Sequence, residues 1–178
     1  MSPVTSDKYR RSMRHVAASV CVIAAKTNGQ RFGMTATSVC SVSMTPPLLL
    51  VCINSEATSH DSLAGASIFS VSVLSDSQRH VADIYAGLSG IARDRRFEAL
   101  EDDWCTGPQD VPMLRNAVTS LACRIVNMIP TGTHTIFIGE VLEARCAEDL
   151  SPLLYARGKY HALGATPVDA RQSPACCE

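Results

Sequence analysis

Two apolar segments separated by Asn28 and Gly29 constrain the fold more than any other feature of the sequence. Residues 16–25 (VAASVCVIAA) combine β-branched and small apolar side chains, and residues 31–43 form a second run suited to a strand. Asn-Gly between two such runs is typical of a type I′ turn, because both central residues of that turn need a positive φ. The sequence therefore predicts that 31–43 runs back antiparallel to 16–25.

More strands are expected along the chain. Pro46 and Pro47 interrupt strand pairing, and residues 48–53 (LLLVCI) are apolar without a break, which predicts a strand buried on both faces. The remaining strand-like runs are 68–74, 118–129, 134–145 and 152–163, the last as a strand or a strand and turn. Many short strands with turn residues between them are typical of an antiparallel β-barrel.

Short helices are expected to decorate this barrel. Residues 5–14 and 76–88 have helical spacing, with Gly87 as a stop for the second, and Ser59 is expected to cap a short helix at 60–66 through its side chain. Residues 89–115 are the least regular part of the chain, and Trp104 within them, the only tryptophan, is expected to be a packing anchor. We expect one domain over residues 1–164 and a loose tail over 165–178.

Composition excludes several classes of function. The net charge is −1, which gives no electrostatic attraction to nucleic acid, and no apolar run reaches the length of a membrane span. The N-terminus has no secretory pattern, so we expect a cytoplasmic protein. Cysteines within the β-type runs (Cys21, Cys40, Cys52 and Cys123) are then expected to be small buried hydrophobes in a reducing compartment. The adjacent pair Cys176 and Cys177 is expected to be incidental, with redox activity as the alternative.

Common catalytic motifs do not occur. The sequence lacks the glycine patterns of Rossmann and P-loop nucleotide sites, and it contains no CxxC pair. Its five histidines are scattered, so a zinc enzyme or a triad hydrolase has little support, and no metal is expected.

The stretch from 33 to 54 (GMTATSVCSVSMTPPLLLVCIN) is the best candidate for a site. It places small hydroxyl residues beside a stiff apolar strand. Such a surface lets backbone and hydroxyl groups approach a flat, anionic ligand closely, and we interpret it as the floor of a flavin site. The alternative is an ordinary edge strand whose Ser and Thr side chains face water.

This stretch also carries a resemblance to a known family. The pattern G-x-T-A-[ST]-x-V-C-S-V-[ST]-x-x-P-P, an apolar strand and Asn, then Arg96-Phe97 and a following Trp, occurs here in order, as do GTHTIFIGEV at 132–141 and LLYARGKYHAL at 153–163. Over residues 9–163 the chain resembles the flavin reductase family. These are the reductase components of two-component flavin-dependent monooxygenases, such as that of 4-hydroxyphenylacetate 3-monooxygenase.

The resemblance implies a fold, an activity and partners. The fold would be an FMN-binding split β-barrel of antiparallel, Greek-key type, usually a homodimer. The activity would be hydride transfer from NADH or NADPH to FMN or FAD. Reduced flavin would then reach a separate monooxygenase by diffusion. A flavin carrier or sensor on the same fold is the alternative, and an FMN-dependent oxidase of a B6-type vitamer is a weaker one, because no second basic cluster is present.

The resemblance also assigns roles to residues. The flavin would be contacted by Thr35, Ala36, Thr37, Ser38, Asn54 and Ser55. Ser59, at a helix start, and Arg96 are the expected phosphate contacts, with Arg95 as the alternative to Arg96. Phe97 would close over one side of the site.

The nicotinamide would lie against the other side of the flavin. His134 is expected beside the ring, where it would orient nicotinamide without acting as an obligatory acid, and Tyr155, Arg157 and Tyr160 are expected to help form this side. Thr133 stands where many family members carry Asp, which leaves the choice between NADH and NADPH open.

Overall fold

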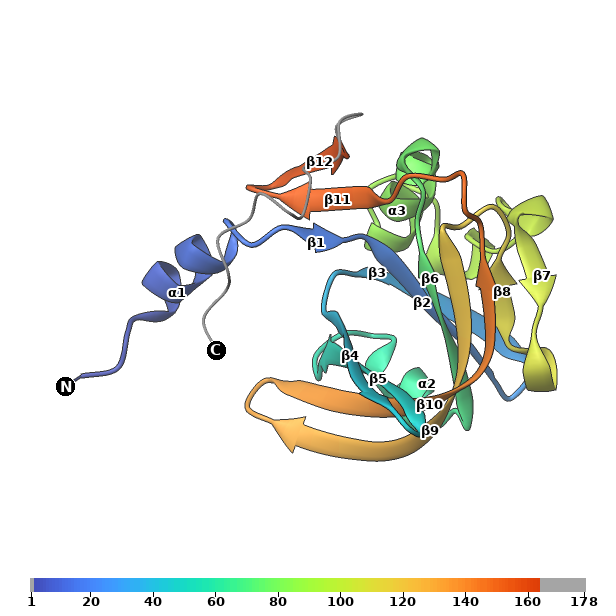
Figure 1. The fold of residues 1–178 in the computed structure, drawn as a ribbon, viewed down its shortest axis with the longest axis horizontal. Helices are drawn as coiled ribbons and strands as arrows, with labels where there is room; N and C mark the ends of the chain where they lie inside the picture. Colours follow the sequence, from blue (N-terminus) through green and yellow to red (C-terminus); the bar gives the residue numbers. More distant parts are fainter. Residues whose placement is uncertain (1, 164–178) are drawn as a thin grey trace.

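The computed structural model describes residues 2–163, which form a curved antiparallel sheet with helices outside it (Figure 1). The sheet has seven strands in the order β3-β2-β6-β9-β10-β5-β4. In chain order these are β2 (Cys21–Thr27), β3 (Gln30–Ala36), β4 (Val39–Met44), β5 (Pro47–Asn54), β6 (Ile68–Val73), β9 (Thr119–Thr131) and β10 (His134–Cys146). The expected mainly β, antiparallel fold is confirmed.

The first hairpin forms as predicted. Asn28 and Gly29 have φ of 51° and 78°, and the register pairs Cys21 with Ala36 through to Thr27 with Gln30. The expected second strand, however, is wrong in its extent. It ends at Ala36, and β4 begins at Val39 on the opposite edge of the sheet. Thr37 and Ser38 therefore cross between the two unpaired edges, a crossing that we call the seam.

The core lies on both sides of β2. Cys21, Ile23 and Ala25 face the inside of the curved sheet, where they pack with Val51, Ile53, Phe69 and Phe137. Val22 and Ala24 face outward and pack with α3 (Arg79–Ala86). This arrangement explains why residues 20–25 are apolar without alternation. The strand expected over 16–25 is wrong in its first part, because Val16 is exposed and Ala18 and Ser19 belong to a separate small sheet. The expectation that 48–53 is buried on both faces is wrong: only Leu49, Val51 and Ile53 are buried, since no layer fully covers the outer face of β5.

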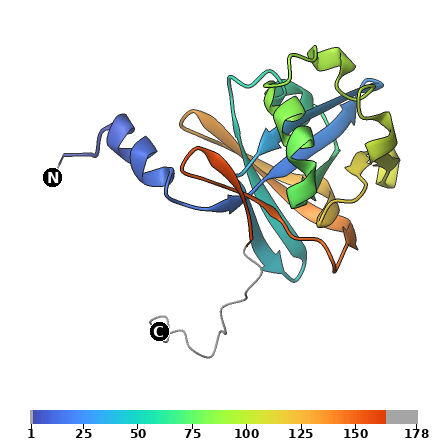
Figure 2. The ribbon, with the colours of Figure 1, turned by 90° about the horizontal axis from the view of Figure 1, so that it is seen from above.

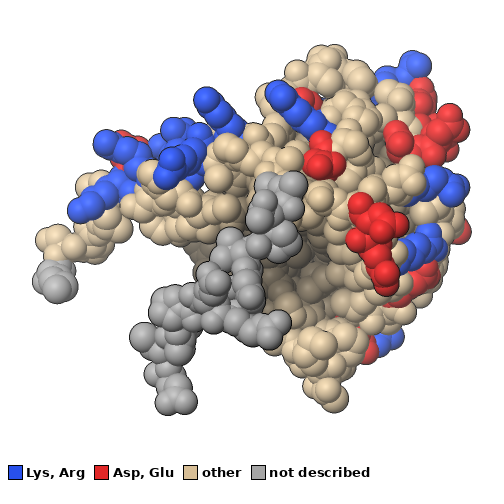
Figure 3. Space-filling model, turned by 45° about the horizontal axis from the view of Figure 1, so that its top comes forward, with Lys and Arg blue, Asp and Glu red and all other residues tan. Residues whose placement is uncertain are grey.

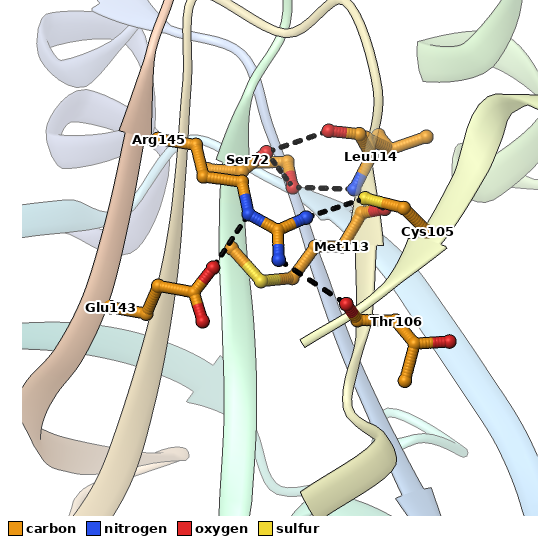
Figure 4. A network of polar contacts seen from close by, with 8 residues as sticks. Ser72, Cys105, Thr106, Met113, Leu114, Glu143 and Arg145 are labelled. Carbon is orange, nitrogen blue, oxygen red and sulfur yellow. Dashed lines mark hydrogen bonds and ion pairs between the residues drawn. The ribbon is translucent and has the colours of Figure 1, made fainter. Parts of the chain in front are cut away.

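The part expected to be irregular contains a small hairpin of β7 (Trp104–Thr106) and β8 (Pro112–Leu114). Buried strand serines hold it against the sheet (Figure 4). Ser72 Oγ accepts from the Leu114 backbone N–H at 3.2 Å, and Ser120 Oγ lies 2.9 Å from both Ser72 Oγ and the Leu114 carbonyl. Arg145 adds outer contacts to Cys105 Sγ at 2.8 Å and to the Thr106 carbonyl at 3.2 Å.

The remaining elements flank the sheet. They are α1 (Ser6–Met13), β1 (Ala18–Ser19), α2 (His60–Ala64), β11 (Leu153–Ala156), β12 (Lys159–Ala162), and the 3-10 turns η1 (Asp76–Gln78), η2 (Arg93–Arg95), η3 (Glu101–Asp103) and η4 (Pro108–Asp110). The last predicted strand is in fact the β11–β12 hairpin, which pairs with β1 in a separate small sheet.

Two parts extend away from the body: α1 and the long arm of the β9–β10 hairpin (Figures 1 and 2). Lys8, Arg10, Arg11 and Arg14 lie on or next to α1, where blue side chains gather in Figure 3. The hollowed middle of the same face is bordered by uncharged residues. None of the described helices is long and apolar enough to cross a bilayer. The expected tail at 165–178, with Cys176 and Cys177, lies outside the described residues.

Candidate flavin site

A cavity of about 450 Å³ opens at the seam. It is lined by residues of β3 and β5, by the end of α3, by the start of β10 and by the β11–β12 hairpin. Eight predicted site residues line this seam cavity: Thr35, Ala36, Thr37, Ser38, Asn54, His134, Tyr155 and Tyr160. Segments separated by more than a hundred residues thus meet at one place, and the volume is in the range of small-molecule sites.

The floor of the seam cavity is an edge strand. β3 pairs only with β2, so about half of its backbone N–H and C=O groups face away from any neighbouring strand. The Thr35 hydroxyl donates to the Ala82 carbonyl of α3 at 2.7 Å, which fixes β3 against that helix. Its side chain is therefore engaged, and what this residue offers to a ligand is its backbone.

His134 and Asn54 sit side by side across β10 and β5, where they are register partners. Thr133 Oγ1 lies 2.9 Å from His134 Nδ1. This contact occupies one ring nitrogen and leaves Nε2 without a hydrogen-bond partner among residues 2–163. The His134 ring is thereby oriented by its neighbour, and its remaining nitrogen is available to a ligand.

Two tyrosines form the opposite wall. Tyr155 and Tyr160 are cross-strand partners of the β11–β12 hairpin, and their rings meet edge to face at 5.5 Å. The Arg79 guanidinium lies 5.5 Å from the Tyr160 ring centroid. Burial, the nearby Asp83 carboxylate and a hydrogen bond to that carboxylate raise the pKa of Tyr160, so this phenol stays protonated well above neutral pH.

A second cavity of about 740 Å³, which we call the arginine cavity, lies farther along β3. It is lined by Thr27, Asn28, Gln30, Arg31, Phe32, Thr58, Ser59, Ser62, Arg93, Asp94, Phe97 and Glu98. Ser59 and Phe97 are thus placed here and not in the seam cavity. Ser59 occupies the N-cap position of α2, but its side chain makes no capping hydrogen bond, so the expected side-chain cap is wrong.

Arg31 and Arg93 bring positive charge to the arginine cavity. The Arg31 guanidinium forms an ion pair with the Glu101 carboxylate at 2.7 Å, and the hydrogen bond between them lowers the pKa of Glu101. The same guanidinium lies 4.9 Å from the Phe97 ring centroid. Arg93 forms no ion pair within residues 2–163, in contrast to Arg95, which pairs with Glu98 at 2.6 Å. An incoming anion would therefore meet Arg93 without having to displace a carboxylate.

Three predicted residues line neither cavity. Arg96 turns inward: its Nε is buried and has no partner among the described residues, and a guanidinium nitrogen lies next to Gly87. Ser55 donates its backbone N–H to the Thr133 carbonyl at 3.0 Å. Arg157 is in the left-handed conformation at the β11–β12 turn, with φ of 51°, and its neighbour Gly158 lines the seam cavity instead.

Sequence reasoning missed other lining residues. Arg93 and Thr58 gave no separate signal, because Arg93 lies within a run of charges and Thr58 within a loop. Ala86 and Leu88 flank the predicted helix stop at Gly87, which hinted that the chain turns there. Among residues 2–163, no three His, Cys, Asp or Glu side chains gather in a way that could hold a metal ion.

Comparisons with known proteins agree on one family. Residues 13–164 match the model of the flavin reductase like domain. The chain is 38% identical to the reductase component of FADH(2)-dependent resorcinol hydroxylase of Rhizobium sp., over 92% of this chain and 90% of that protein. It is 35% identical to the FMN reductase (NADH) RutF of Pantoea ananatis, over 90% of this chain and 82% of that protein.

A solved structure supports the same assignment at the level of the fold. The NADH:FAD oxidoreductase SgcE6 of Streptomyces globisporus, in complex with NAD and FAD fragments, superposes with a TM-score of 0.81 at 30% identity. The match covers 95% of this chain and 99% of that one. With a split barrel, a cavity at its seam and a family match across most of its length, the chain belongs to the flavin reductase like family.

Proposed function

We propose that this chain is an NAD(P)H-dependent flavin reductase. It takes hydride from NADH or NADPH, passes it to FMN or FAD, and supplies reduced flavin by diffusion to a separate flavin-dependent monooxygenase. The observation that carries the proposal is the seam cavity, which joins the hydroxyl-rich stretch at 35–38 to His134 and the tyrosine pair. The names of the relatives, an FMN reductase (NADH) and a hydroxylase reductase component, support this activity.

The seam cavity fits an isoalloxazine ring. Its floor offers the unpaired backbone of β3 together with Thr37 and Ser38, and Asn54 supplies an amide at the side. Backbone donors aimed at the polar edge of the ring would stabilise the negative charge that develops there on reduction. Ser55 would contribute by holding the end of β5 beside Thr133 through its backbone hydrogen bond to the Thr133 carbonyl.

The phosphate would lie in the arginine cavity. Both cavities adjoin β3, at residues 34–36 and 30–32, and four residues of strand span about 13 Å. A flavin with a ribityl chain can therefore extend along this edge. Ser59 and Arg93 are the phosphate contacts that this arrangement supports, in preference to the expected Arg96 and Arg95, and Phe97 closes the floor beside them.

The nicotinamide would enter from the side of His134. Bound flavin supplies the redox chemistry, and the protein has to hold the two rings in register. His134, oriented by Thr133, would donate or accept at the carboxamide, while Tyr155 and Tyr160 would keep the ring stacked and exclude water. Arg157, next to Gly158 at the rim, would meet the nucleotide beyond the ring. No side chain is needed as a general base, because hydride moves directly between the rings.

Two further parts of the proposal concern assembly and compartment. Val126, Met128 and Ile129 are exposed on the β9–β10 arm, and Tyr9, Met13 and Val16 are exposed on or beside α1. Apolar residues on projecting elements favour a homodimer that covers them. The described cysteines are free thiols, in keeping with the reducing cytoplasm, where the proposal places the enzyme. Light scattering on a sizing column would test the dimer.

The activity is tested by following the oxidation of NADH and of NADPH by purified protein, with and without added FMN, FAD or riboflavin. We expect turnover that depends on added flavin. Flavin binding without nucleotide oxidation would establish the carrier alternative instead. A protein that neither binds flavin nor oxidises the nucleotide would overturn the proposal.

A further inference from the structure

Residues 54–60 connect the two cavities. Asn54 lines the seam cavity, whereas Thr58 and Ser59 line the arginine cavity. The segment between them is a series of turns, with the Ala57 N–H donating to the Asn54 carbonyl at 2.9 Å and the Glu56 N–H donating to Asn54 Oδ1 at 3.0 Å. Its conformation therefore sets the separation between the ring contacts and the phosphate contacts.

The first end of this segment is fastened to β10 through backbone. Asn54 pairs with His134, and the Ser55 N–H donates to the Thr133 carbonyl at 3.0 Å. These contacts continue the sheet register and do not depend on side chains. The ring end of the segment is thus fixed whatever happens at the other end.

The far end is fastened to the same strand by the side chain of His60. Its Nε2 lies 2.9 Å from Thr135 Oγ1, and its ring packs edge to face on the buried Phe137 at 5.8 Å. Nδ1 lies 3.0 Å from Asp61 Oδ1, which favours the tautomer with N–H at Nδ1. Nε2 then accepts the hydrogen bond from the hydroxyl of Thr135, a residue only 6% exposed.

We infer that His60 is a positioning residue for flavins that carry a phosphate. Its hydrogen bond to Thr135 holds the turn at Thr58 and Ser59 at a fixed distance from Asn54. The inference rests on the proposed function, and it adds that affinity for the phosphate-bearing ligand depends on a residue that touches no ligand. Loss of the hydrogen bond should weaken FMN binding and leave riboflavin binding almost unchanged, because riboflavin lacks the phosphate.

The fold offers a reason why this contact can be removed without unfolding α2. Leu63 is 1% exposed and anchors the helix in the core, and Thr27 Oγ1 donates to the Ser62 carbonyl at 3.0 Å. The helix thus stays attached to β2. The hydrogen bond between His60 and Thr135 therefore determines the position of the turn at Thr58 and Ser59, which precedes α2.

Two substitutions separate the contacts of the His60 ring. In His60→Gln the amide reaches the position of Nε2 and can keep the bond to Thr135, whereas in His60→Asn it matches only Nδ1. Thr135→Val removes the other partner and keeps its shape. Affinities for FMN and for riboflavin are measured by quenching of flavin fluorescence, and circular dichroism checks that each variant is folded.

We expect His60→Asn and Thr135→Val to weaken FMN binding about threefold to tenfold, the range for one hydrogen bond. Riboflavin affinity should change less than twofold, and His60→Gln should restore FMN binding. Equal losses for both flavins, or no loss for either, would overturn the inference. If the wild-type protein binds flavin and also oxidises NADH or NADPH in the flavin-dependent activity assay, the proposed function stands although the inference fails. A wild-type protein that does neither would refute both.

Discussion

Gly33 lies where β3 touches the aromatic core, and replacing Gly33 with Ala tests whether that contact is tight. A Cβ at this position would lie 2.7 Å from Tyr85 Cε1 and 2.9 Å from Cδ1. Tyr85 is only 3% exposed, and its ring packs edge to face on Phe97 at 5.4 Å and on Trp104 at 5.6 Å. The ring therefore has no free space into which it can withdraw.

The magnitude follows from two opposing effects. Tyr85 or β3 would have to move by about 0.7 Å to reach 3.4 Å, the near limit of ordinary contact, and such overpacking costs roughly 1–3 kcal/mol. Replacing Gly with Ala also restricts the unfolded chain, which returns about 0.4–1 kcal/mol. We expect a net destabilisation of about 1–2 kcal/mol, or a fall in Tm of about 2–8 °C for a chain of this size.

Thermal and urea unfolding would measure the Gly33→Ala effect. Gly65→Ala is the matched control, because its Cβ would meet nothing closer than 3.4 Å, and we expect it to be near neutral. In a Tyr85→Leu background the added methyl group should cost less than in the wild type, since the ring edge is gone. An unchanged or raised Tm for Gly33→Ala, or the same cost in both backgrounds, would refute the reasoning.

Other outcomes are expected on the same structural grounds. His134→Ala should raise the apparent KM for the nucleotide more than it lowers kcat, and steady-state kinetics that show lost turnover with unchanged KM would contradict its orienting role. Ser72→Ala should cost about 1–3 kcal/mol in urea unfolding, because the buried Leu114 N–H loses its acceptor; an unchanged midpoint would argue against that contact. Burial raises the pKa of Cys123 to about 12, so a thiol reagent at pH 8 should label exposed Cys40 and spare Cys123 until the chain unfolds; equal labelling rates would show that the core opens readily.

Local chemistry made much of the fold predictable. A type I′ turn needs a positive φ at both central residues, which Asn28 and Gly29 adopt, and this motif predicted the first hairpin and its antiparallel direction. The apolar run that became β2 is buried on both faces, as continuous apolarity indicates. Residues 68–74 alternate between apolar and small polar side chains, yet in β6 Ser70 and Ser72 are buried as well. Trp104 was expected to be a packing anchor, and it is 5% exposed within the aromatic cluster.

Predictions failed where long-range geometry decides. Nothing in Thr37 and Ser38 marks a break, since neither residue forbids a strand; the chain leaves β3 there because it must cross to the other edge of the sheet. The uniform apolarity of 48–53 indicated two buried faces, but whether another layer covers β5 is a property of the whole fold. Cys40 lies on an edge strand and is exposed for a similar reason.

The candidate site shows the same division. The family resemblance indicated which segments take part, and eight of the residues that it assigned line the seam cavity. Within the charge run at 93–96, however, the direction of each arginine depends on the 3-10 turn Arg93–Arg95, which the sequence did not reveal. That turn places Arg93 at the arginine cavity and turns Arg96 inward.

The seam runs between two strand edges that lack neighbours, β3 and β4. Both cavities adjoin the edge of β3, and no neighbouring strand on that side limits how far a ligand extends beyond its phosphate. We therefore expect tolerance toward the adenylate portion, so that FMN and FAD would compete for the same site. Discrimination between FMN and FAD would then depend on contacts that the adenylate makes outside the barrel.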